Sequence, residues 1–181
     1  MLIRKATRDD IPLLERLIPE SARGLSASYY TPQQIESAIV HVFGVDTQLI
    51  SDGTYFVAED EGRIVGCGGW SKRRTLYGGD QMKAADDPLL DARTEPARIR
   101  AFFVDPGWAR RGAGRLLLEA CEKAAREAGF GALELVATLP GEPLYKALGY
   151  EVSERFDIAL PGEVVLPLAR MMKIIPPRGD S

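Results

Sequence analysis

Residues 98–128 constrain the fold more than any other part of the chain. A β-prone run over residues 98–104 is followed by a glycine-containing loop and then by a helical run over residues 112–128. The helical run carries an apolar stripe of Leu117, Ala120, Cys121, Ala124 and Ala128. A strand, a glycine turn and a helix N-terminus in this order form an anion site, because the first-turn amides and the helix dipole point to the same place.

The residues of this loop suit a diphosphate. Gly112 and Gly114 lack Cβ atoms, so a phosphate can approach the backbone closely. Arg110, Arg111 and Arg115 add positive charge, and guanidinium groups pair with phosphate oxygens in bidentate fashion. We therefore predict a diphosphate on the backbone amides of residues 110–115. The alternative is a solvated basic helix start without a ligand.

Two common diphosphate-binding loops do not match the residues found here. A P-loop ends in Gly-Lys-Ser/Thr, and no lysine occupies that place. A dinucleotide-binding fingerprint needs a third glycine where Leu117 stands. A nucleotide-binding α/β protein is therefore kept only as an alternative.

Strand and helix patterns alternate along the rest of the chain. Strand patterns fall at residues 2–6, 55–59, 63–67, 132–137 and 164–175, and helical patterns at residues 11–18, 31–43 and 143–148. The second and third strand patterns flank Asp60-Glu61-Gly62 and predict a hairpin. Because a hairpin precedes the strand–helix–strand crossover, the sheet is expected to be mixed. Gly66, Gly68 and Gly69 indicate a bulge or a close backbone neighbour in the second hairpin strand.

Composition sets the remaining limits. The 181 residues carry a net charge of −3, which favours neither nucleic acid nor an anionic membrane as a partner. No apolar run approaches the roughly 20 residues that span a bilayer. The first five residues lack a signal-peptide core. The two cysteines, Cys67 and Cys121, lie far apart in the sequence, and we expect both to be buried and reduced. We therefore expect a cytoplasmic protein. With His41 as the single histidine, no metal site is expected.

Two stretches lack clear periodicity: residues 71–97 and the end of the chain. We expect one domain over residues 1–175 and a flexible C-terminal tail over residues 176–181. An irregular stretch as long as residues 71–97 is uncommon inside a compact domain unless it is functional or mobile. We expect it to cover a substrate site together with Ser26-Ala27-Ser28-Tyr29-Tyr30.

The loop and three other motifs together resemble the GCN5-related N-acetyltransferase (GNAT) family. The loop is similar to the acetyl-CoA signature of that family, Arg/Gln-x-x-Gly-x-Gly/Ala, in the stretch Val104-Asp105-Pro106-x-Trp108-Ala109-Arg110-Arg111-Gly112-x-Gly114-Arg115-x-Leu117-Leu118. The other motifs are Ile3-Arg4-Lys5-Ala6-Thr7-x-x-Asp10, the hairpin Phe56-Val57-Ala58 to Ile64-Val65-Gly66, and Leu144-Tyr145-x-x-Leu148-Gly149-Tyr150. The resemblance covers nearly the whole chain in the family's order. It departs at Ala109, where the pattern has Arg or Gln.

The resemblance implies an α/β (α+β) fold in a single domain. Its sheet is expected to be mixed, mostly antiparallel and twisted, with six to seven strands flanked by about four helices. The implied activity is direct transfer of an acetyl group from acetyl-CoA, the donor cosubstrate, to a primary amine of a small molecule or a peptide. Relatives also suggest a homodimer. The alternative is a non-catalytic acyl-CoA-binding regulatory domain.

The resemblance also implies roles for single residues. Phe102, Phe103 and Val104 are expected to bind the pantetheine arm through their main-chain groups. The residues expected to bind the pyrophosphate are Arg110, Arg111, Gly112, Ala113, Gly114 and Arg115. Tyr145 matches the tyrosine that protonates the leaving thiolate. A tyrosine pKa of about 10 against about 8.5 for a thiol keeps the phenol protonated at neutral pH. Tyr145 could instead be only a packing residue. The incoming amine must also lose a proton, and the group that accepts it is either water or a carboxylate from residues 71–97.

Overall fold

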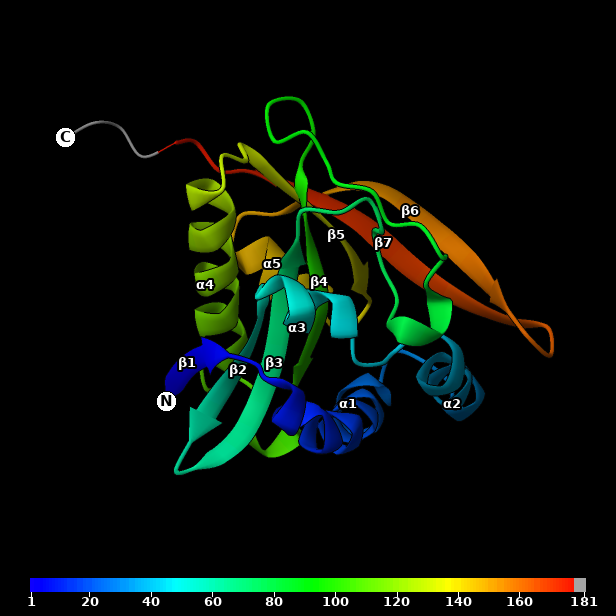
Figure 1. Ribbon diagram of the computed structural model, residues 1–181. Helices are drawn as coiled ribbons and strands as arrows, with labels where there is room; N and C mark the ends of the chain where they lie inside the picture. Colours follow the sequence, from blue (N-terminus) through cyan, green and yellow to red (C-terminus); the bar gives the residue numbers. More distant parts are fainter. Residues whose placement is uncertain (178–181) are drawn as a thin grey trace.

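The computed structural model describes residues 1–177, which form one seven-stranded sheet with helices on both faces (Figure 1). The strands are β1 (Leu2–Lys5), β2 (Tyr55–Asp60), β3 (Arg63–Ser71), β4 (Ala97–Val104), β5 (Ala132–Thr138), β6 (Glu151–Leu160) and β7 (Val164–Ile174). The α-helices are α1 (Ile11–Ser26), α2 (Pro32–His41), α3 (Thr47–Asp52), α4 (Ala113–Glu127) and α5 (Glu142–Ala147). Three short 3-10 helices are η1 (Arg8–Asp10), η2 (Asp80–Met82) and η3 (Pro106–Trp108).

The sheet has the order β1-β2-β3-β4-β5-β7-β6, and β4–β5 is its parallel pair, with antiparallel pairs elsewhere. The predicted fold class, a mixed and mostly antiparallel sheet of six to seven strands, is thereby confirmed. Over residues 1–177, no helix combines the length and the apolar character needed to cross a bilayer.

Pairing between β4 and β5 stops early. Ala97 lies opposite Leu133 and Arg98 opposite Glu134, and no further pair joins these two fully described strands. Shortly after the last pair, Ala101 adopts a φ of 53°, which few residues other than glycine do. One edge of β4 is therefore without a neighbouring strand from Ile99 onward, and this opening positions the site described below.

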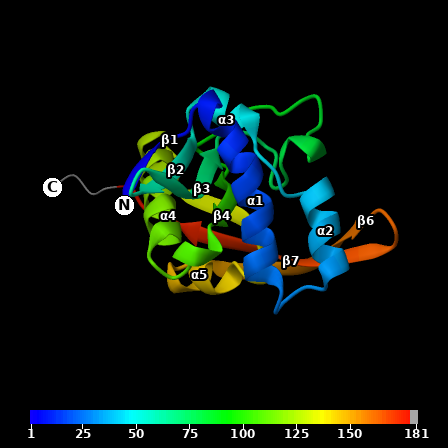
Figure 2. The ribbon, with the colours of Figure 1, turned by 90° about the horizontal axis from the view of Figure 1, so that it is seen from below.

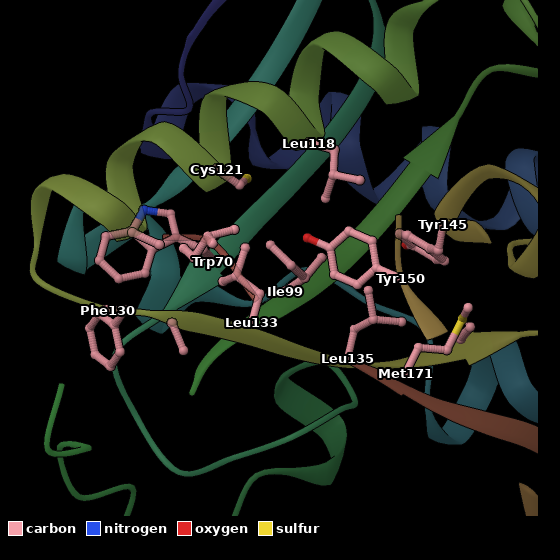
Figure 3. Close-up of a cluster of buried hydrophobic side chains, with 14 of the residues drawn as sticks. Trp70, Ile99, Leu118, Cys121, Phe130, Leu133, Leu135, Tyr145, Tyr150 and Met171 are labelled. Atoms are coloured by element: carbon pink, nitrogen blue, oxygen red, sulfur yellow. The ribbon is translucent and has the colours of Figure 1, made fainter. Parts of the chain in front are cut away.

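Helices α4 and α5 lie together on one side of the sheet, apart from α1 and α2, in both views of the ribbon (Figure 1, Figure 2). On the first face, Leu118 and Cys121 of α4 pack against the sheet residues Ile99, Leu133 and Leu135 (Figure 3). On the second face, the apolar stripe of α1 packs against β2 and β3 through Leu14, Leu17, Ile18, Val57 and Cys67. Both cysteines are buried and free, as expected.

Two elements are absent from the sequence-based prediction. Helix α3 has only six residues, and its ends are set by Asp46, whose carboxylate accepts the amides of Gln48 and Leu49, and by Gly53 with a φ of 73°. Strand β6 pairs with β7 along its whole length, and its alternate residues Phe156, Ile158 and Leu160 pack toward α2. Residues 71–97 are irregular, as predicted, apart from the strand ends, η2 and one bridge between Arg73 and Leu89. Of the predicted tail, residues 178–181 lie outside the described part of the chain.

The glycines of β3 occupy crowded positions, as predicted. A Cβ atom on Gly69 would lie 2.7 Å from Cδ2 of Tyr55 and 2.8 Å from the carbonyl oxygen of Thr54. That carbonyl is held in place because it accepts the amide of Trp70 at 3.1 Å. The register of β3 on β4 also shifts between Cys67 and Gly69, which is the expected bulge.

We predict that Gly69→Ala lowers the free energy of unfolding by about 1–3 kcal/mol, because the added methyl group overpacks a buried backbone contact. The matched control is Gly131→Ala, since a Cβ atom there meets no atom within 4 Å. The control should change stability by less than about 0.5 kcal/mol. Urea unfolding followed by circular dichroism measures both, and equal effects would contradict the packing assigned to Gly69.

Candidate active site

A cavity of about 720 Å³ lies where β4 and β5 separate. Its walls come from β4, from the loop before α4 and the first turn of that helix, from α5, from the carboxyl-terminal half of α1 and from residues 76–79. The cavity therefore joins the face covered by α4 and α5 to the face covered by α1 and α2. The structure brings together in it nearly all the residues that the sequence predicted for a site.

The N-terminus of α4 forms one end of the cavity. Gly112 is the residue before the helix and has a φ of 91°, and the first helical hydrogen bond runs from the Leu116 amide to the Gly112 carbonyl at 3.0 Å. Within residues 1–177, the amides of Gly112, Ala113, Gly114 and Arg115 have no acceptor. Four unpaired N–H groups at the positive end of the helix dipole favour an anion there.

The two glycines at this helix start have different roles. Gly112 is exposed, and a Cβ atom there would meet nothing within 4 Å. Glycine is favoured at this position because the turn requires a left-handed backbone conformation. Gly114 is buried, and a Cβ atom there would lie 2.7 Å from Cδ2 of Leu144 in α5. The sequence-based interpretation assigned both to phosphate approach, whereas the missing side chain of Gly114 serves the contact between α4 and α5.

The three arginines of the loop also differ. Arg110 and Arg115 line the cavity, are exposed and have no ion-pair partner among the described residues. The guanidinium of Arg111 lies over the ring of Trp108, 5.5 Å from its centroid, and Arg111 is not part of the cavity wall. Arg110 and Arg115 are therefore the charges available to an anion at the helix start.

The carboxyl-terminal half of β4 forms the side of the cavity. Phe102, Phe103 and Val104, whose main-chain groups were assigned to the pantetheine arm, all line it. The Val104 amide donates to the hydroxyl of Ser21 on α1 at 3.1 Å. This link between α1 and the open edge of β4 is missed by sequence reasoning, because Ser21 lies beyond the helical pattern recognised at residues 11–18.

Tyr145 lies on α5 and also lines the cavity. Its ring packs edge-on against Phe102, with centroids 6.3 Å apart, and against Tyr150 at 5.9 Å. The residue is 8% exposed, and its hydroxyl makes no hydrogen bond to any residue in the described range. Burial raises the pKa of Tyr145 above its ordinary value, so the phenol keeps its proton at neutral pH.

Deep in the cavity lies Arg100, which sequence reasoning misses. It is 2% exposed, and its Nη1 donates to the carbonyl of Thr75 at 3.0 Å. Its Nη2 donates to the carbonyl of Gly78 and lies 2.9 Å from Oδ2 of the fully buried Asp46. Burial lowers the pKa of Arg100, while Asp46 opposes that shift, and a guanidinium stays charged at neutral pH. Arg100 thus fixes the irregular segment to β4.

No aspartate, glutamate, lysine or histidine contributes to the described wall of the cavity. None of the carboxylates of residues 71–97 lines the cavity, and three of them accept backbone amides elsewhere: Asp80 that of Thr47, Asp87 that of Thr75 and Asp91 that of Arg93. The structure therefore does not support a carboxylate of this segment as the group that accepts the proton of the amine. Water stays as the expected acceptor. Across residues 1–177, no cluster of three or more His, Cys, Asp or Glu side chains is suited to a metal ion.

Solved structures with this fold include N-acetyltransferases. A GCN5-related N-acetyltransferase from Rhodopseudomonas palustris aligns over 96% of this chain and 95% of its own, with a TM-score of 0.70 and 20% identity. The PaiA N-acetyltransferase of Thermoplasma acidophilum, in complex with coenzyme A, aligns over 96% and 98%, with a TM-score of 0.64 and 18% identity. The yncA protein of Salmonella typhimurium, solved with acetyl-CoA, aligns over 100% and 97%, with a TM-score of 0.63 and 16% identity.

The family follows from the sequence itself. The sequence model of the Acetyltransferase (GNAT) family matches residues 20–150, and the chain belongs to this family. That match confirms the resemblance stated from the motifs. None of the curated proteins compared with the chain matches it by sequence.

Proposed function

We propose that this protein transfers the acetyl group of acetyl-CoA directly to a primary amine of a small molecule or a peptide. One observation carries the proposal: a single cavity connects the unpaired amides at the start of α4, the open edge of β4 and the phenol of Tyr145. These three parts correspond to a site for a diphosphate, a site for an extended amide-containing arm and a proton donor.

The cavity fits the donor in chemical terms. Amides 112–115 and the side chains of Arg110 and Arg115 would hold the pyrophosphate. The pantetheine arm contains amide groups, and an unpaired strand edge binds such groups as it would bind a further strand. The complexes of two structural relatives with coenzyme A and acetyl-CoA support this assignment. Acetyl-CoA supplies an activated thioester carbonyl.

Tyr145 is the proposed proton donor. During transfer a C–N bond forms to the acceptor, the C–S bond of the thioester breaks, and the departing thiolate takes a proton. Burial raises the pKa of Tyr145 and keeps the phenol protonated, and the same burial makes a thiolate formed in the cavity a stronger base, so that it can take the proton. The phenolate is then reprotonated from solvent. Because the wall holds no carboxylate, water takes the proton that the amine releases.

The missing carboxylate also favours a second candidate. A domain that binds acyl-CoA and regulates a partner would need the anion site but no base. Release of free CoA in the presence of an amine, absent without the amine, separates the two functions.

We predict that Arg110→Gln combined with Arg115→Gln weakens acetyl-CoA binding by about 100-fold or more, since charge-assisted hydrogen bonds to phosphate are worth roughly 1.5–3 kcal/mol each. The control is Arg111→Gln, whose guanidinium lies over Trp108 outside the cavity wall. It should bind almost as the wild type does. Titration calorimetry measures the three Kd values, and a larger effect from Arg111→Gln would disprove the assigned positions.

We predict that Tyr145→Phe lowers kcat by about 100-fold, within the range of general acid catalysis, while the Kd for acetyl-CoA is unchanged. Tyr150→Phe is the matched control, because Tyr150 is buried outside the cavity wall and its hydroxyl donates to Glu122 at 3.1 Å. That variant should lose some stability but keep its turnover. Unchanged turnover in Tyr145→Phe would make Tyr145 a packing residue.

A further inference from the structure

The backbone amide of Val104 faces the open edge of β4. Its neighbours in the chain both point to β3, since Phe103 pairs with Cys67 and the Asp105 amide donates to the Val65 carbonyl at 2.8 Å. Successive amides of an antiparallel strand point to opposite edges, so the amide between these two points away from β3. It therefore lies on the edge that β5 leaves open.

This amide already has a partner. It donates to the hydroxyl of Ser21 on α1 at 3.1 Å, and Ser21 is 4% exposed and lines the same cavity. An open strand edge ordinarily offers such an N–H group directly to a carbonyl oxygen of an extended ligand. Here the hydroxyl oxygen of Ser21 occupies the position that this carbonyl oxygen would take.

The hydroxyl of Ser21 has an unused hydrogen. A serine hydroxyl carries one donor besides its acceptor sites, and in a helix it commonly donates to the carbonyl four residues earlier, here that of Leu17. Within residues 1–177, Ser21 makes no such bond, and its side chain takes part only in the bond that it accepts from Val104. Because a buried donor is costly when left unpaired, an oxygen of a ligand in the cavity would complete it.

The position of Ser21 is fixed by close packing. Gly24 lies one helical turn after Ser21, and a Cβ atom there would be 2.3 Å from Cγ of Pro106, which follows the end of β4. Helix α1 is thus held beside β4 at two neighbouring points (Figure 2). Because β4 leads into the loop before α4, a ligand whose diphosphate lies at the α4 start would pass Ser21 with the first part of its arm.

We propose that Ser21 binds the donor. Its oxygen keeps the Val104 amide, while its hydrogen donates to a carbonyl oxygen of the pantetheine arm, that of the amide nearer the pyrophosphate. The hydroxyl thus extends the strand edge, and the arm reaches Val104 through it. The inference rests on the proposed function and adds a residue to its donor site.

The first test measures the Kd values of two ligands by titration calorimetry. One is CoA, and the other is 3′-phospho-ADP, which is CoA without its pantetheine arm. Ser21→Ala should weaken CoA binding about fivefold, as expected when one hydrogen bond is lost, and leave 3′-phospho-ADP unchanged. Because both ligands are measured on the same variant, the ratio of the two Kd values cancels any loss of folded protein. Ser37→Ala on α2, outside the cavity wall, is the matched control and should change neither Kd.

Three results would overturn the inference. If Ser21→Ala binds CoA as tightly as the wild type or more tightly, the serine competes with the arm for the Val104 amide. Equal weakening of both ligands would make the serine a purely structural residue. If the wild-type protein binds neither ligand, the proposed function fails, and this inference fails with it.

The second test restores the hydroxyl. Ser21→Thr keeps the oxygen and its hydrogen at the same position and should recover most of the CoA affinity that Ser21→Ala loses. A threonine variant that binds CoA as weakly as the alanine variant, with 3′-phospho-ADP unaffected, would refute a contact through the hydroxyl.

Discussion

The early end of the pairing between β4 and β5 is the feature on which the site depends. A parallel pair at the centre of a sheet normally continues along both strands, because each unpaired backbone group is costly when buried. Here the pairing ends at Arg98, and Ala101 takes a left-handed backbone that costs on the order of 1–2 kcal/mol. The buried hydroxyl of Tyr55 donates to the Ala101 carbonyl at 3.0 Å, and Ser21 accepts the Val104 amide, so α1 and β2 hold the opened strand in place.

The opening has two consequences for chemistry. It leaves a strand edge free for a ligand, and the same cavity reaches from the helix start at Gly112 to Arg100 and Phe103 on β4. Its accessible positive charges are Arg110 and Arg115 near the helix start, whereas Arg100 is buried and paired with Asp46. Under the proposed function, the donor would lie along this opening, so the fold and the proposed donor site share one structural feature.

Sequence reasoning succeeds here where the signal is local. The loop before α4, the hairpin and the motif around Tyr145 are each encoded within a few neighbouring residues, and all lie where they were expected. Sequence reasoning misses helix α3 because six residues are too few to show a helical period, although Asp46 and Gly53 are recognisable capping residues. Strand β6 is missed although Val152, Phe156, Ile158 and Leu160 fall on alternate positions, a strand signal that could have found it. The roles of Arg100 and Ser21 are missed for another reason. Their partners are distant in sequence, and only the folded chain brings them together.

Hydrogen exchange with and without acetyl-CoA tests the central claim most directly. If the donor lies along the open edge of β4 with its pyrophosphate on the start of α4, exchange should slow in peptides that cover residues 99–104 and 112–115. Peptides from β6 should exchange as before, because that strand already pairs with β7 along its length. Slower exchange elsewhere, with these two segments unchanged, would contradict a donor site in the opening between β4 and β5.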